Sequence, residues 1–109
     1  YPDLTGYYQA RIQRNIEVLE QEIAAEKAQI QELDEQIAAY QVQITQTSER
    51  MPYLSRQQRT DAENSIETWK KEIAECQEKQ QAATEQITEL VDEQEKQKQL
   101  LESSEVGGL

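Results

Sequence analysis

The stretch MPYLSRQQRTDAENS, residues 51–65, separates two long segments of helical character. It contains Pro52, the only proline outside the first few residues of the chain. Proline cannot continue a helix interior, and it also disfavours helical geometry at the preceding residue, here Met51. We therefore expect the chain to turn between Glu49 and Thr60, with one helix on each side.

Two signals compete for the start of the second helix. Ser55 is a candidate N-cap, because a serine hydroxyl can accept a hydrogen bond from a free amide in the first helical turn. Thr60 with Glu63 three residues later has the pattern of a capping box. The sequence leaves both starts open.

Apolar residues recur on both sides of the turn at alternating steps of three and four, the pattern of a coiled-coil heptad. The first series is Ile12, Ile16, Leu19, Ile23, Ile30, Leu33, Ile37, Tyr40, Ile44 and Met51, with polar Glu26 and Thr47 at the intervening places. The second is Ile66, Trp69, Ile73, Cys76, Ala83, Ile87, Leu90 and Leu101, with Gln80, Gln94 and Gln97. We call each series a seam, and together they predict a long antiparallel two-helix coiled-coil hairpin.

The two seams fit together if facing residues are equidistant in sequence from Tyr53. This register sets Ile30 against Cys76, a large side chain against a small one, as interdigitating packing prefers. It also sets Glu26 against Gln80, so that two polar seam residues share one layer, which can specify register.

We expect one all-α domain over residues 1–109, in the form of a rod about 65 to 70 Å long at about 1.5 Å per residue. Its parts are helix 1 at about 5–49, the tip at about 50–59, helix 2 at about 60–104 and a frayed tail at 105–109. Gln9, Gln94 and Gln97 place polar side chains on the seam near the open end, so we expect weaker pairing there.

The composition and charge of the chain limit the functions that it could have. The chain has 109 residues, a mean hydropathy of −0.95 and a net charge of −11, so it would repel nucleic acid and anionic membranes. No run of apolar residues is long enough for a membrane span. Because the chain begins at Tyr1 rather than at Met, we expect it to be a fragment of a larger protein.

Catalysis finds little support in the residue types. The chain has no histidine, its single cysteine lies on a seam, and its three glycines form no phosphate-binding loop. A seam thiol is expected to pack as a small apolar residue. We therefore expect no enzymatic activity, no cofactor and no metal site.

The tip has a different character from the acidic helices. Three of the five arginines, Arg50, Arg56 and Arg59, lie there, together with Tyr53 and Leu54. Arginine and tyrosine at an exposed end are typical of a binding surface. The alternative is that the arginines are only solvated and the apolar residues only close the hairpin.

The segment YLSRQQRTDAENSIE, residues 53–67, resembles the hairpin turn of periplasmic adaptor proteins of the haemolysin-D type, also called membrane fusion proteins. Residues Leu54, Ser55, Arg56 and Gln57 match the Ile-Ser-Arg-Gln of that turn, and Asp61, Ala62, Glu63 and Asn64 are similar to the helix start that follows. The usual tip glycine is replaced by Pro52 or Tyr53. Arg50 and Leu54 keep the family's Arg-to-Leu spacing, but the family's serine place then falls on Asp61.

The resemblance implies a docking hairpin in a tripartite or type I export system. The parent adaptor would be anchored in the inner membrane of a Gram-negative bacterium and lie in the periplasm. Its partners would be an inner-membrane transporter, reached through domains outside this chain, an outer-membrane channel at the tip, and neighbouring copies of the hairpin. The tip contact residues would be Arg50, Tyr53, Leu54, Ser55, Arg56 and Arg59. The alternatives are a prefoldin-like chaperone arm and a structural stalk.

Overall fold

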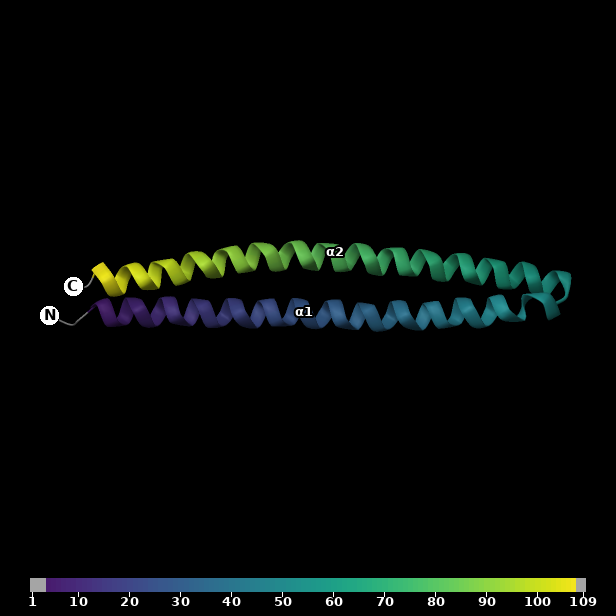
Figure 1. Ribbon diagram of the computed structural model, residues 1–109, viewed down its shortest axis with the longest axis horizontal. Helices are drawn as coiled ribbons and strands as arrows, with labels where there is room; N and C mark the ends of the chain where they lie inside the picture. Colours follow the sequence, from purple (N-terminus) through teal and green to yellow (C-terminus); the bar gives the residue numbers. More distant parts are fainter. Residues whose placement is uncertain (1–3, 108–109) are drawn as a thin grey trace. The chain divides into compact units, whose positions relative to one another are not determined.

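The computed structural model describes residues 4–107, with the side chains of residues 4–104. The fold is an all-α antiparallel two-helix coiled-coil hairpin, which confirms the predicted fold class (Figure 1). Helix α1 spans Leu4–Arg50, the short 3₁₀ helix η1 spans Met51–Tyr53, and α2 spans Arg56–Gly107. No strand occurs within residues 4–107.

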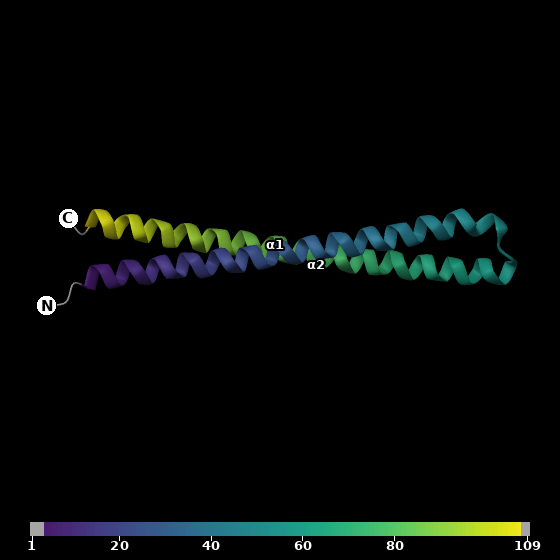
Figure 2. The same cartoon turned by 90° about the horizontal axis from the view of Figure 1, so that it is seen from below.

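The chain divides into two compact units. The terminal unit consists of Tyr1–Ala28 and Ala83–Leu109, and the turn unit is Gln29–Ala82. In each unit a segment of α1 lies beside an antiparallel segment of α2 (Figures 1 and 2). Both ends of the chain belong to the terminal unit, and the connection through η1 belongs to the turn unit.

Burial follows the predicted heptad. In α1 the buried and half-buried residues are the predicted seam residues together with Gln9, and every other described residue of this helix is exposed. In α2 the whole predicted seam is again buried or half-buried, and Ala62, Ser65, Glu72 and Ser104 join it. The apolar period therefore determined which helix face is covered, as two-helix packing requires.

In the terminal unit, apolar and amide side chains hold the two helices together. Ile12 is 4% exposed, so the helices stay in contact in the part of the seam where weaker pairing was expected. Gln94 donates a hydrogen bond from Nε2 to the carbonyl oxygen of Ile16 at 3.3 Å, and Asn15 Nδ2 donates to Gln97 Oε1 at 3.4 Å. The amide groups thus link the two helices.

The turn unit combines apolar and polar seam contacts in the same way. Leu33 and Cys76 are each 5% exposed. The Cys76 thiol lies 3.7 Å from Gln36 Oε1, a weak hydrogen bond. Gln80 Nε2 donates to the carbonyl oxygen of Ile30 at 3.1 Å and to Asp34 Oδ1 at 2.6 Å.

The interhelical hydrogen bonds do not join the residues that the register centred on Tyr53 sets opposite each other. Gln94 is hydrogen-bonded to Ile16, and the midpoint of this pair in the sequence is Ser55. Cys76 is hydrogen-bonded to Gln36, and the midpoint of that pair is Arg56. The centre of the contacts thus lies two to four residues further along the chain, as the remaining interhelical hydrogen bonds also show.

Side-chain direction explains the displacement. Side chains lean toward the N-terminus of their own helix. In an antiparallel pair the two leans are opposite in space, so each side chain meets a partner with a higher residue number than the one level with its own Cα. Burial agrees: Thr47 is only 6% exposed, although the predicted register sets it opposite Arg59, which is exposed.

The turn is shorter than predicted because Ser55 is the N-cap of α2. The Ser55 hydroxyl accepts from the backbone N–H of Gln58 at 3.2 Å, and Gln58 Oε1 accepts from the Ser55 N–H at 3.0 Å, a reciprocal capping box. Thr60 lies inside the helix, where its hydroxyl donates to the Arg56 carbonyl oxygen at 3.2 Å. Helix α2 therefore begins before the predicted start at about residue 60.

The far end of α2 also differs from the prediction. The helix continues to Gly107, past the predicted end at about residue 104. The remainder of the predicted frayed tail, residues 108–109, lies outside the described residues. On the other side of the turn, α1 ends at Arg50 and agrees with the predicted boundary within one residue.

Candidate interaction surface at the turn

The six residues predicted to form the tip contact come from four consecutive elements of the turn unit. Arg50 ends α1, Tyr53 ends η1, Leu54 and Ser55 form the connection, and Arg56 and Arg59 lie in the first turns of α2. Pro52 stands at the start of η1, where its missing N–H costs nothing. The Leu54 N–H donates to the Met51 carbonyl oxygen at 3.2 Å and closes the turn.

Tyr53 is the most exposed large apolar residue among those described, at 88%. Its ring therefore contributes little to the packing that closes the hairpin. Leu54 is half-buried and has extended backbone geometry, with φ −92° and ψ 148°. Of the two, Leu54 helps close the turn and Tyr53 is presented to solvent.

The turn arginines make no ion pair with any residue whose side chain the structure describes. Between residues 4 and 104 one ion pair is found within 4.0 Å, and it joins Lys70 to Glu67. Arg59 Nη2 donates instead to the Leu54 carbonyl oxygen, at 3.5 Å. Residues 50–60 hold three arginines and no carboxylate, in a chain of net charge −11. The turn is thus a local positive patch on an acidic protein.

A groove lies between α1 and α2 beside this patch, and we call it the turn groove. Its lining residues are Thr47, Arg50, Leu54, Gln58, Asp61, Ala62, Ser65 and Trp69. Its volume of about 280 Å³ is at the lower edge of the roughly 300–1,000 Å³ typical of small-molecule sites. The groove therefore has room for one or two protein side chains rather than for a large cofactor.

Sequence reasoning treated two of these lining residues chiefly as part of the seam. Trp69 and Thr47 are seam residues, yet both also line the turn groove. Gln58 and Asp61 were not identified as part of the surface. Trp69 was the feature of the sequence that could have indicated the groove. It is a bulky aromatic residue on the seam, and two helices alone cannot enclose its ring fully.

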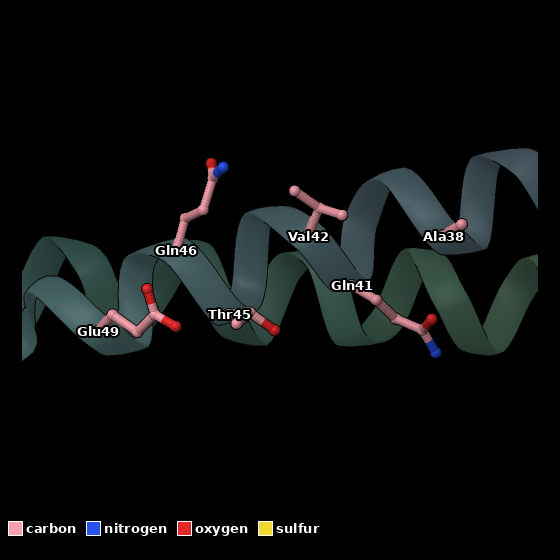
Figure 3. Close-up of a pocket in the computed structure, with 6 residues that line it drawn as sticks. All are labelled: Ala38, Gln41, Val42, Thr45, Gln46 and Glu49. Carbon is pink, nitrogen blue, oxygen red and sulfur yellow. The ribbon is translucent and has the colours of Figure 1, made fainter.

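Two further hollows lie on the α1 side of the turn unit. One is lined by Gln46, Glu49, Arg50 and Tyr53, so Arg50 borders both this hollow and the turn groove. The other is a shallow face lined by Ala38, Gln41, Val42, Thr45, Gln46 and Glu49, shown in Figure 3. In that view Val42 and Gln46 project away from the helices, and no lining residue comes from α2.

Other kinds of site find no support in the described part of the chain. No group of three or more Cys, Asp or Glu side chains within it could hold a metal ion. The thiol of Cys76 is free and buried on the seam. Neither helix contains, between residues 4 and 107, an apolar segment long enough to span a bilayer.

No family model matches the chain, and no curated protein or solved structure matches it. The fold and the turn surface themselves define its class: an antiparallel helical hairpin with a polar-bridged seam and a basic, aromatic turn.

Proposed function

We propose that the chain is the helical hairpin of a haemolysin-D-type periplasmic adaptor, with a non-enzymatic role as spacer and docking arm. The parent protein, anchored in the inner membrane, would link an inner-membrane export pump to an outer-membrane channel. The pump would be reached through domains outside this chain, and further copies of the hairpin would pack side by side. Contact with the channel would be made by the turn residues Arg50, Tyr53, Leu54, Ser55, Arg56 and Arg59.

The exposure of the turn is the observation that carries this proposal. Tyr53 is 88% exposed, and within the described part of the chain none of the three turn arginines is in an ion pair. Stability of the hairpin explains neither feature, because an exposed ring buries little area and a solvated arginine contributes little. Both residue types are enriched where proteins bind one another.

The helices suit a spacer. Helix α1 has 47 residues, so at about 1.5 Å per residue it rises about 70 Å. Its covered face is a continuous heptad seam in both units, which supports the helix along its length. Flanking domains would join the terminal unit, which holds both chain ends, while the turn belongs to the other unit.

The prefoldin-like alternative is less favoured by the connection between the helices. Such a chaperone arm needs strands there, and only Leu54 and Ser55 separate η1 from α2, with no strand in residues 4–107. A structural stalk has the same fold as the proposed adaptor. It differs in having an inert turn, so the turn surface must be tested directly.

A photo-crosslinker at Tyr53 in the parent protein, expressed in its own cells, tests the proposal. We expect an adduct with an outer-membrane channel, identified by mass spectrometry. The matched control is Val42, which is also exposed, at 54%, but lies on α1 away from the turn. Adducts from Tyr53 that contain no channel protein would contradict the adaptor function.

Charge reversal at the turn is the second measurement. Arg56→Glu with Arg59→Glu should lower the yield of the channel adduct about tenfold or more, because both attractive charges become repulsive. Arg11→Glu with Arg14→Glu changes the same charge on exposed residues of the terminal unit and should leave the yield unchanged. Equal adduct yields from both double variants would indicate a stalk with an inert turn.

A further inference from the structure

We infer that the turn groove binds an acidic protein segment that carries a bulky apolar side chain. The apolar side chain enters between Leu54, Ala62 and Trp69, and a neighbouring carboxylate pairs with Arg50. This inference rests on the proposed function, because it names the chemistry of the surface that the turn contacts. Three features of the groove support it.

The first feature is an apolar surface of the right size. Leu54, Ala62 and Trp69 are half-buried, so part of each remains accessible from the groove. The volume of about 280 Å³ suits a leucine-sized side chain together with its neighbours. At protein interfaces, the few residues that carry most of the binding energy lie in well-packed, desolvated pockets.

The second feature is unpaired positive charge at the rim. Arg50 lines the groove and has no carboxylate within 4.0 Å in the described part of the chain. Arg59 Nη2 lies 3.5 Å from the carbonyl oxygen of Leu54, another lining residue, so a second guanidinium is close. A guanidinium binds a carboxylate through two parallel hydrogen bonds, which fixes the orientation of the partner.

The third feature is a preformed turn. The capping box between Ser55 and Gln58 and the hydrogen bond from the Leu54 N–H to the Met51 carbonyl oxygen hold the connection in place. Since these bonds form within the chain, the turn needs no partner to become ordered. Preorganised surfaces lose less conformational entropy on binding, which favours a specific contact.

Asp61 is the one carboxylate that lines the groove, and it opposes an acidic partner. Its Oδ1 accepts a hydrogen bond from Gln57 Nε2 at 3.2 Å. Arg50 and Asp61 thus supply charges of opposite sign in one groove. A nucleic acid is the weaker candidate, because the chain's net charge of −11 repels its backbone and it offers no aliphatic side chain for the groove.

The chain contains a built-in reporter for the test. Trp69 is its only tryptophan and lines the groove, so its fluorescence reports occupancy directly. The 109-residue chain is titrated with the blocked peptide Glu-Leu-Asp-Leu-Glu at low ionic strength. Two matched peptides serve as controls: Gln-Leu-Asn-Leu-Gln lacks the charge, and Glu-Ser-Asp-Ser-Glu lacks the apolar side chains. We expect a saturable change with the first peptide and binding weakened at least about threefold with each control.

Variants of the two charged lining residues complete the test. Arg50→Gln should weaken binding of the acidic peptide about threefold to fivefold, and Asp61→Asn should strengthen it about twofold. Arg14→Gln, on an exposed part of the terminal unit, should change nothing. Far-ultraviolet circular dichroism confirms that each variant is helical.

The inference is overturned by any of three results: no saturable Trp69 response, equal binding of the three peptides, or unchanged affinity in Arg50→Gln. Its failure is distinguishable from failure of the proposed function. A channel adduct from Tyr53 without the peptide response would retain the adaptor and exclude this groove chemistry. The peptide response without a channel adduct would retain the groove and exclude the channel as the partner.

Discussion

Gln80 Nε2 lies 3.1 Å from the main-chain carbonyl oxygen of Ile30, on the opposite helix. The same arrangement recurs in the terminal unit, where Gln94 Nε2 lies 3.3 Å from the carbonyl oxygen of Ile16. A carbonyl oxygen has two lone pairs, so it can accept this bond in addition to the one within its helix. A glutamine is therefore tolerated on the seam, and its reach favours one register of the two helices.

Gln80→Leu should raise the stability of the chain and lower its structural specificity. Leucine at this half-buried position gains apolar burial, the Ile30 carbonyl oxygen can keep the bond within its own helix, and Asp34 is exposed and can bond to water. We expect the free energy of unfolding to rise by about 0.5 to 1 kcal/mol in a denaturant titration. Sedimentation should show additional oligomers, since a polar seam residue restricts register and oligomer state.

Gln81→Leu is the control for that substitution, because Gln81 is the exposed neighbour of Gln80. Its unfolding free energy should stay within about 0.5 kcal/mol of the parent. A loss of stability in Gln80→Leu would show that the polar interactions of Gln80, among them the hydrogen bonds to Ile30 and Asp34, outweigh the apolar gain.

Cross-linking to Cys76, the only cysteine, measures the register directly. In the structure its sulfur lies 3.7 Å from Gln36 Oε1, whereas the register centred on Tyr53 sets it opposite Ile30. With a short thiol-reactive cross-linker, Gln36→Cys should form an intramolecular bridge several times faster than Ile30→Cys at high dilution, as read by mass spectrometry. Faster bridging in Ile30→Cys would restore the Tyr53-centred register.

The heptad seams were predictable because burial in a two-helix coiled coil depends on the spacing of the apolar residues along each helix. Every residue of the predicted series, from Ile12 through Leu101, is buried or half-buried. The register was not predictable in the same way. The period alone leaves the alignment of the two helices free. Matching the two seams about Tyr53, which sets Ile30 against Cys76, ignored the lean of the side chains.

The candidate site was predictable in its exposed part. Arg50, Tyr53 and Arg59 lie at the turn, as the composition of the stretch indicated. The groove was missed because its lining depends on how α1 and α2 approach each other, as the joint presence of Thr47 and Trp69 shows. Spacing within one helix does not contain that information.

Ser55→Ala should destabilise the turn by about 1 kcal/mol, because the first turn of α2 loses the acceptor for the Gln58 N–H. Denaturant unfolding measures the loss, and faster amide exchange near Gln58 would locate it. Thr60→Ala is the control: the Thr60 hydroxyl only donates back to the Arg56 carbonyl oxygen within the helix, so we expect a change below about 0.5 kcal/mol. A larger effect at Thr60 than at Ser55 would show that the helix begins at the capping box of Thr60 and Glu63 instead.

Leu33→Ala should cost about 2 to 4 kcal/mol of unfolding free energy, because Leu33 is 5% exposed and its removal leaves a cavity between α1 and α2. Val42→Ala on the same helix removes exposed methyl groups, and we expect a change within about 0.5 kcal/mol. Both values come from denaturant titrations at several protein concentrations. If the two substitutions cost the same, the face of α1 that includes Val42 must be covered as well, which in this chain requires a second copy.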